Sequence, residues 1–97
     1  GNDLGKTPLM GAAIHDAPGI VEILLNKGAL INAQDDLGWT ALMYAGDWNQ
    51  TGVIKVLAAH GADLNLRNLK GETALEVTRQ KPSSAKAYEL LKYLGAK

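Results

Sequence analysis

The chain has 97 residues, no cysteine and a formal net charge of zero. Its length suits one small domain, and the lack of cysteine excludes disulfides, thiolate metal sites and cysteine nucleophiles. Zero net charge argues against broad electrostatic capture of nucleic acid, and no apolar run is long enough to cross a bilayer. No signal-peptide pattern opens the chain, so a cytoplasmic location is the default expectation.

The charges are distributed unevenly along the chain. Residues 1–50 carry a net charge of −4, whereas residues 51–97 carry +4. Two solvated faces explain this difference most simply. The alternative is a polarised surface that orients a partner during docking.

The sequence repeats itself at a constant interval, because Gly5, Gly38 and Gly71 are evenly spaced. Each of these glycines opens a similar string, namely Gly-Lys-Thr-Pro-Leu-Met, Gly-Trp-Thr-Ala-Leu-Met and Gly-Glu-Thr-Ala-Leu-Glu. A fixed period of this length indicates a stack of similar structural units, none of which can bury its apolar faces alone.

A first helix is predicted to begin within each of these strings. Thr7, Thr40 and Thr73 stand where an N-cap belongs, because a hydroxyl there accepts from the free backbone N–H groups of a helix start. Pro8 then occupies a first helical position, where its missing donor costs little. Small residues that allow close packing of neighbouring helices follow in the first two copies: Gly11, Ala12, Ala13, Ala45 and Gly46.

A second helix is predicted in each copy. It begins at Pro18 in the first copy, and Thr51 and Ser84 are the candidate N-caps of its equivalents. Apolar residues at helical spacing should face the core. In the three copies these are Ile20, Val21, Ile23, Leu24 and Leu25, then Val53, Ile54, Val56 and Leu57, then Leu90, Leu91 and Leu94.

Glycines mark the ends of the second helices. Gly28 and Gly61 are separated by the same interval as the glycines that open the copies, and they are typical of left-handed C-caps. Gly95 falls one residue late, which predicts a single insertion within residues 81–84. The segments that follow Gly28 and Gly61 are rich in turn residues and should form protruding, hairpin-like loops.

These residues resemble the ankyrin repeat, whose pattern is roughly Asp-x-x-Gly-x-Thr-Pro-Leu-His-x-Ala-Ala followed by x-Val-x-x-Leu-Leu-x-x-Gly-Ala-x-x-Asn-Ala. The resemblance implies an all-α solenoid of stacked helix-turn-helix units with hairpin-like loops. It implies one domain over residues 1–97, with repeats at about 2–34, 35–67 and 68–97. It also implies a module that binds another protein, with no enzymatic activity and no cofactor.

The chain departs from the family pattern at two places. The histidine after Thr-Pro-Leu is replaced by Met10, Met43 and Glu76, so some hydrogen bonding between repeats should be lost. The Gly-His that joins the two helices is replaced by residues 16–18 and 49–51. These replacements should change the turns locally without changing the fold.

The two ends of the chain are expected to differ. Thr78 and Arg79 stand where Ala12 and Ala13 stand in the first copy, and they should be too large for another repeat to dock on them. We therefore expect a polar C-terminal cap. The N-terminus carries no such cap, so the chain should be the C-terminal part of a longer array, or its first repeat should be covered by another chain.

The resemblance places the partner-binding surface on the loop tips and the inner face of the first helices, where ankyrin proteins usually bind. Non-repeating residues there are the candidates, since variation on a fixed scaffold suits recognition. The candidate binding residues are Lys6, His15, Asp36, Trp39, Asp47, Trp48, Arg67, Lys70 and Glu72. The same surface should include Asp3, Leu4, Ile14, Gln34, Leu37, Leu69, Gln80 and Lys81.

Trp39 and Trp48 are expected to form the centre of this surface. Tryptophan is enriched at interface hot spots because it buries a large rigid area. Both should face the concave side, with Asp36 and Asp47 nearby. The alternative is that each ring lies flat over its own repeat and fills a groove.

Catalytic and metal-binding chemistry is not expected. His15 and Asp16 are adjacent at a helix end and point in different directions, with no nucleophile nearby. Clusters of histidine and carboxylate at metal-ligand spacing are absent from the sequence. The basic C-terminal residues make a weak case for nucleic acid. Two functions remain: capture of a partner protein, and assembly of the uncapped first repeat with further repeats or with a second chain.

Overall fold

The structure is a computed structural model that describes residues 5–96. This part of the chain is helical and contains no strand, so the predicted all-α fold is confirmed. The helices are α1 (Pro8–Ile14), α2 (Pro18–Asn26), α3 (Ala41–Asp47), α4 (Thr51–Ala59), α5 (Ala74–Arg79), the short 3-10 helix η1 (Pro82–Ser84) and α6 (Ala85–Tyr93). The candidate contacts Asp3 and Leu4 lie outside the described residues.

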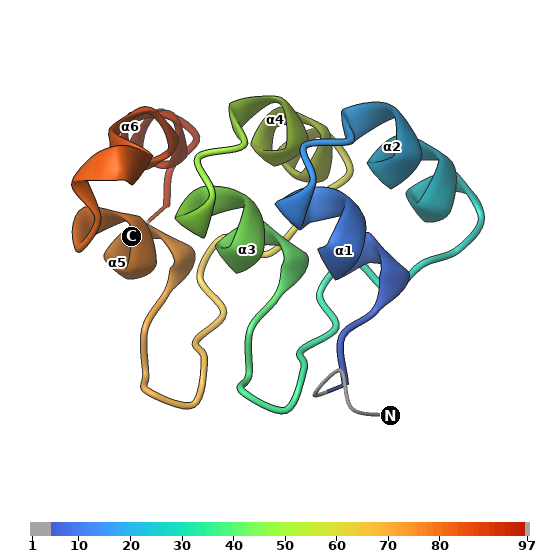
Figure 1. Ribbon diagram of the computed structural model, residues 1–97, viewed down its shortest axis with the longest axis horizontal. Helices are drawn as coiled ribbons and strands as arrows, with labels where there is room; N and C mark the ends of the chain where they lie inside the picture. Colours follow the sequence, from blue (N-terminus) through green and yellow to red (C-terminus); the bar gives the residue numbers. More distant parts are fainter. Residues whose placement is uncertain (1–4, 97) are drawn as a thin grey trace.

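The helices form two layers (Figure 1). The first helices of the three units, α1, α3 and α5, lie next to one another in an inner layer, and α2, α4 and α6 form an outer layer. The loops that join the units project from the inner layer on one side. We call the surface made by these loops and the inner helices the loop face. No helix of residues 5–96 has the length and apolar character that a bilayer span requires.

The predicted caps of the first helices are confirmed. The hydroxyl groups of Thr7, Thr40 and Thr73 each accept a hydrogen bond from the backbone N–H three residues later, at 3.3, 3.2 and 3.3 Å. In the third copy the Glu76 carboxylate also accepts from the Thr73 N–H, which completes a capping box. In the first copy the Met10 sulfur takes this second role at 3.5 Å.

The predicted caps of the later second helices make no capping hydrogen bond. Thr51 is the first residue inside α4 and makes no side-chain cap, because Gln50 occupies the N-cap position. Ser84 stands at the N-cap of α6, but its hydroxyl donates instead to the Asp47 carbonyl at 2.9 Å. It therefore joins the third repeat to the second.

The second helices end as predicted. Gly28 and Gly61 have φ of 93° and 86°, the left-handed region that glycine favours. The Gly28 N–H bonds the Leu25 carbonyl and the Ala29 N–H bonds the Leu24 carbonyl, and this pair of bonds makes a Schellman motif. The carbonyl groups at the helix end are satisfied in this way.

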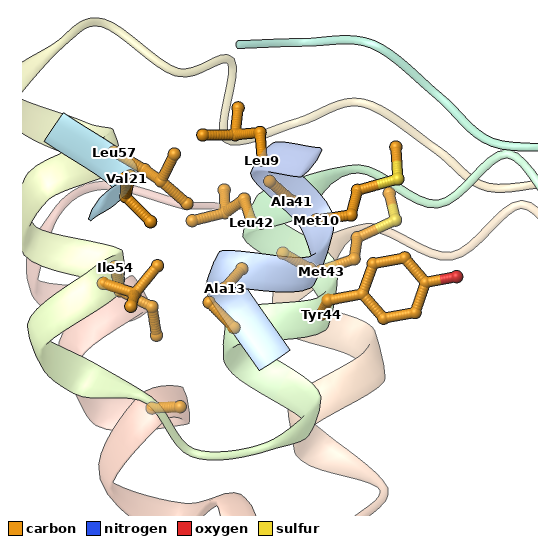
Figure 2. Packing of buried hydrophobic residues seen from close by; sticks show 14 of the residues in the cluster. Leu9, Met10, Ala13, Val21, Ala41, Leu42, Met43, Tyr44, Ile54 and Leu57 are labelled. Atoms are coloured by element: carbon orange, nitrogen blue, oxygen red, sulfur yellow. The ribbon is translucent and has the colours of Figure 1, made fainter. Parts of the chain in front are cut away.

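The core fills the space between the two helical layers (Figure 2). Met10 and Met43 occupy the histidine positions of the family pattern, and both side chains are buried. Figure 2 shows these two side chains pointing the same way from α1 and α3. A thioether makes no strong hydrogen bond, so at these positions the seam between repeats is apolar.

Other groups supply hydrogen bonds between the repeats. Gln34 Nε2 donates to the Arg67 carbonyl and Gln50 Nε2 donates to the Ile14 carbonyl, both at 2.9 Å. Further inter-repeat bonds at 2.8–3.0 Å are Ala87 N–H to Asn49 Oδ1, Asp63 N–H to Asn32 Oδ1, and Leu69 N–H to the Leu37 carbonyl. The loss expected from the missing histidines is therefore offset by amide side chains.

The turns between paired helices keep their path despite the missing glycine. Asp16 and Asn49 take its place with φ of 51° and 57°. Asp and Asn are the non-glycine residues that best tolerate this left-handed conformation. The local change expected in these turns therefore leaves the helix pairs in place.

The third unit contains the predicted insertion. The second helices begin at Pro18, Thr51 and Ala85, so α6 begins one residue later than the constant interval of the repeat would place it. The extra residue lies between α5 and α6, where the chain forms η1.

Thr78 was expected to hinder the docking of a further repeat, but it is turned toward the preceding unit instead. Thr78 is buried, its hydroxyl donates to the Leu75 carbonyl at 2.8 Å, and its methyl group is directed at Gly46 of the second unit. The rotation of α5 about its axis directs this position toward the preceding repeat. Arg79, by contrast, is exposed as expected.

Candidate functional site

Two equivalent polar side chains build the loop tips. Asp35 Oδ1 accepts from the N–H groups of Leu37 and Trp39, both at 2.9 Å. Asn68, the corresponding residue of the next loop, accepts in the same way from Lys70 and Glu72, at 2.9 and 3.0 Å. Such turns hold short loops in one conformation, because the side chain replaces a backbone acceptor.

The second loop is also anchored to the helix below it. The Tyr44 hydroxyl on α3 donates to Asp35 Oδ2, and both side chains are buried. Burial and then the bond to Asp35 raise the pKa of Tyr44 well above its ordinary value. In the third unit Val77 takes the place of tyrosine, and Asn68 Nδ2 donates instead to the Glu72 carboxylate at 3.0 Å.

Between the second and third loops lies a hollow of about 490 Å³, which we call the Trp39 groove. It is lined by Lys6, Leu37, Trp39, Tyr44, Asp47, Leu69 and Lys70. The Trp39 ring is half-buried and tilted against the Tyr44 ring, with centroids 5.0 Å apart. An adjoining hollow of about 160 Å³ shares Trp39, Asp47 and Lys70, and Glu72 and Lys81 extend it toward α5.

Charged groups surround the groove in defined pairs. Asp47 forms an ion pair with Lys81 at 3.0 Å. Lys6 Nζ lies 5.2 Å from the centroid of the Tyr44 ring, a cation–π contact. Hydrogen bonds from Asn68 and then Gln80 lower the pKa of Glu72, so this carboxylate is charged at neutral pH.

The structure brings five of the nine candidate residues together at these two hollows. They are Lys6, Trp39, Asp47, Lys70 and Glu72. Trp48 is 57% exposed at the C-cap of α3 and lines neither hollow. Arg67 donates to the Gly71 carbonyl at 2.7 Å and lies 3.7 Å from Glu76. His15 and Asp36 are exposed and also lie outside the two hollows.

Two residues of the site were missed by sequence reasoning. They are Asp35, which enters the sequence analysis only through the net charge of residues 1–50, and Tyr44, which does not enter it. A signal was present for both, since Asp35 and Asn68 are equivalent positions and both can form such turns. Tyr44 stands where Gly11 and Val77 stand in the other copies, and this variation placed it on the loop face.

The family comparison agrees with the repeat geometry. The model of a family described as "Ankyrin repeats (3 copies)" matches residues 1–68, more than half of the chain. The chain belongs to the ankyrin repeat family. The residues that follow this match contain the third helix pair, α5 and α6, with the insertion before α6. Gly71 and Thr73 keep the spacing of Gly38 and Thr40 there. A search of curated proteins found no match.

Ankyrin repeats are generally protein–protein interaction modules and are typically not enzymes. No group of three or more histidine or carboxylate side chains able to hold a metal ion occurs among residues 5–96. The loop face of this ankyrin domain presents aromatic and charged side chains on loops that are held by hydrogen bonds.

Proposed function

We propose that this ankyrin domain binds a partner protein through the Trp39 groove. The observation that carries the proposal is a partly open aromatic floor flanked by exposed leucines. Leu37 and Leu69 are exposed at the tips of adjacent loops, and the Leu69 N–H to Leu37 carbonyl bond of 3.0 Å holds those tips together. A preordered apolar site loses little entropy on binding.

A matched pair of leucine substitutions tests this proposal. Leu69 borders the groove and is 76% exposed, whereas Leu30 lies outside it and is 77% exposed. Both can accept glutamate without disturbing the core. Leu69→Glu should weaken capture of the partner at least about thirtyfold, the effect of removing a hot spot, whereas Leu30→Glu should leave it unchanged.

The partner can be obtained by affinity capture from the source cells, with affinities then measured by calorimetry. Trp39→Ala should weaken binding as strongly as Leu69→Glu, and Trp48→Ala should have little effect. Thermal unfolding of each variant shows that the fold is retained. Equal binding by the wild type and Leu69→Glu would contradict the proposal.

A second function is supported by the first repeat, whose outer apolar surface is left exposed by residues 5–96. We call this surface, made by Ile20 and Leu24, the N-ward face. Ile20 is 54% exposed, whereas the residues at its position in the other repeats, Val53 and Ala87, are fully buried. In those repeats the preceding unit covers the position, since α2 packs on α4 and α4 on α6.

The opposite end of the stack does not offer a matching surface. Arg79, Tyr88 and Lys92 form what we call the C-ward face, with the Lys92 ammonium 5.5 Å from the Tyr88 ring centroid. In the first two repeats, the position of Arg79 holds Ala13 and Gly46. The position of Tyr88 holds Val21 and Ile54, and the position of Lys92 holds Leu25 and Ala58. We therefore propose that the N-ward face accepts another ankyrin repeat with small and apolar residues at these positions.

An engineered C-ward face tests this assembly role. The substitutions Arg79→Ala, Tyr88→Ile and Lys92→Ala copy the residues of the inner repeats and should make the chain associate head to tail. Sedimentation velocity at increasing concentration measures the association. Adding Ile20→Lys should abolish it, because the lysine places a charge in the contact. A folded triple variant that stays monomeric would contradict the assembly role.

A further inference from the structure

We infer that the Trp39 groove accepts an extended segment in which a large apolar side chain is flanked by carboxylates. This inference rests on the proposed binding function and specifies the chemistry of the partner. It follows from the shape of the groove and from the balance of charge around it.

The floor and walls of the groove call for an apolar side chain. The rings of Trp39 and Tyr44 line the groove, and Leu37 and Leu69 line it from the bonded loop tips. The volume of about 490 Å³ exceeds that of any single side chain, so the groove can hold one large apolar residue with its neighbouring backbone. The two leucines, exposed in the free chain, would be covered by such a residue.

The anions of the groove are already engaged within the chain. Asp47 is paired with Lys81 at 3.0 Å, and Glu72 accepts from Asn68 at 3.0 Å and from Gln80 at 2.7 Å. A cationic partner would therefore have to compete with internal partners for each carboxylate. This arrangement disfavours a basic segment.

The cations of the groove are less compensated. Among residues 5–96, no carboxylate lies within 4.0 Å of the Lys6 or Lys70 ammonium group. Lys70 acts on Glu72 only at longer range, as the smallest of the named contributions to the lowered pKa of that carboxylate. The cation–π contact of Lys6 leaves its N–H donors available to an incoming carboxylate. Asp36 is exposed at the tip of the second loop but leans toward Gly5 and does not line the groove.

The two lysines stand on opposite sides of the tryptophan. Lys6 belongs to the loop before α1 and Lys70 to the loop before α5, whereas Trp39 belongs to the loop between them. A segment that crosses the loops could place its apolar residue at Trp39 and one carboxylate at each lysine. Carboxylates paired with lysine at such a rim mainly increase the association rate and the specificity.

A random peptide library displayed on phage, selected on the whole chain, tests this inference. The enriched peptides should carry aspartate or glutamate on both sides of a leucine, phenylalanine or tryptophan. The double substitution Lys6→Glu and Lys70→Glu should lower the affinity for these peptides about tenfold or more, because each lysine that attracts a carboxylate is replaced by a group that repels it. Lys55→Glu, an exposed lysine on α4, is the matched control and should leave the affinity unchanged.

The outcomes separate this inference from the binding function on which it rests. One outcome is that the peptides lose binding to the Leu69→Glu variant and yet bind the Lys6→Glu, Lys70→Glu variant as well as the wild type. This result would support the groove as the binding site and would contradict the requirement for carboxylates in the bound segment. Peptides that bind the Leu69→Glu variant as well as the wild type would contradict both. A selection that enriches basic peptides, or none, would also overturn the inference.

Discussion

Replacement of Gly38 by alanine is expected to lower the free energy of unfolding by about 3 kcal/mol, the sum of a left-handed backbone penalty and a steric clash. Gly38 has φ of 77°, and a Cβ built on it would lie 2.7 Å from the backbone nitrogen of Leu69. That nitrogen donates to the Leu37 carbonyl and joins the two loops. Because the contact is with backbone, it cannot be relieved by a rotamer change.

Gly71 provides the control for this substitution. It is the equivalent glycine of the third loop and has the same φ of 77°, but nothing lies within 4 Å of its added Cβ. Gly71→Ala should therefore cost only the backbone penalty, about 1 kcal/mol. Urea denaturation measures both values. Equal losses would show that the contact between loops contributes nothing beyond the conformation of each glycine.

The second large effect is expected at Asp35. Asp35→Ala removes the acceptor of two backbone N–H groups and leaves the buried Tyr44 hydroxyl without its partner, which should cost about 3 kcal/mol. Asp35→Asn should cost about half as much or less, since Asn68 forms the same turn in the next loop. Tyr44→Phe should cost about 1.5 to 2 kcal/mol, the value of a bond to a charged group. Equal losses for alanine and asparagine would contradict this role of the carboxyl group.

The same contact predicts a dependence of stability on alkaline pH. Burial and the bond to Asp35 raise the pKa of Tyr44 in the folded chain above its unfolded value. The contribution of Tyr44 is therefore fully present below about pH 10 and is lost as the pH rises above it, at about 1.4 kcal/mol per pH unit. The difference in unfolding free energy between the wild type and Tyr44→Phe should shrink above pH 10. Parallel curves would contradict the raised pKa.

Features that depend on local backbone chemistry could be predicted from the sequence. The constant period of the repeat located the threonine caps, and Gly28 and Gly61 located the ends of α2 and α4. The late Gly95 located the insertion before α6. Each follows from a residue type acting on its immediate neighbours.

Features that depend on packing between units could not be predicted in the same way. The direction of the Thr78 side chain depends on how α5 is rotated about its axis where it packs against Gly46. No short sequence pattern encodes this rotation. Trp48 follows the last residue of α3, so its ring lies beyond the groove that Trp39 lines. The bond between Tyr44 and Asp35 joins residues nine positions apart through a loop whose path was not known.

Binding at the Trp39 groove is tested by observing the two tryptophans separately while a partner binds. The chain contains two tryptophans, so its 15N-labelled form gives two indole N–H signals, which Trp39→Phe and Trp48→Phe assign. On addition of the captured partner, the Trp39 signal should shift or broaden and the Trp48 signal should stay in place. A shifted Trp48 signal with an unchanged Trp39 signal would show that the partner binds elsewhere.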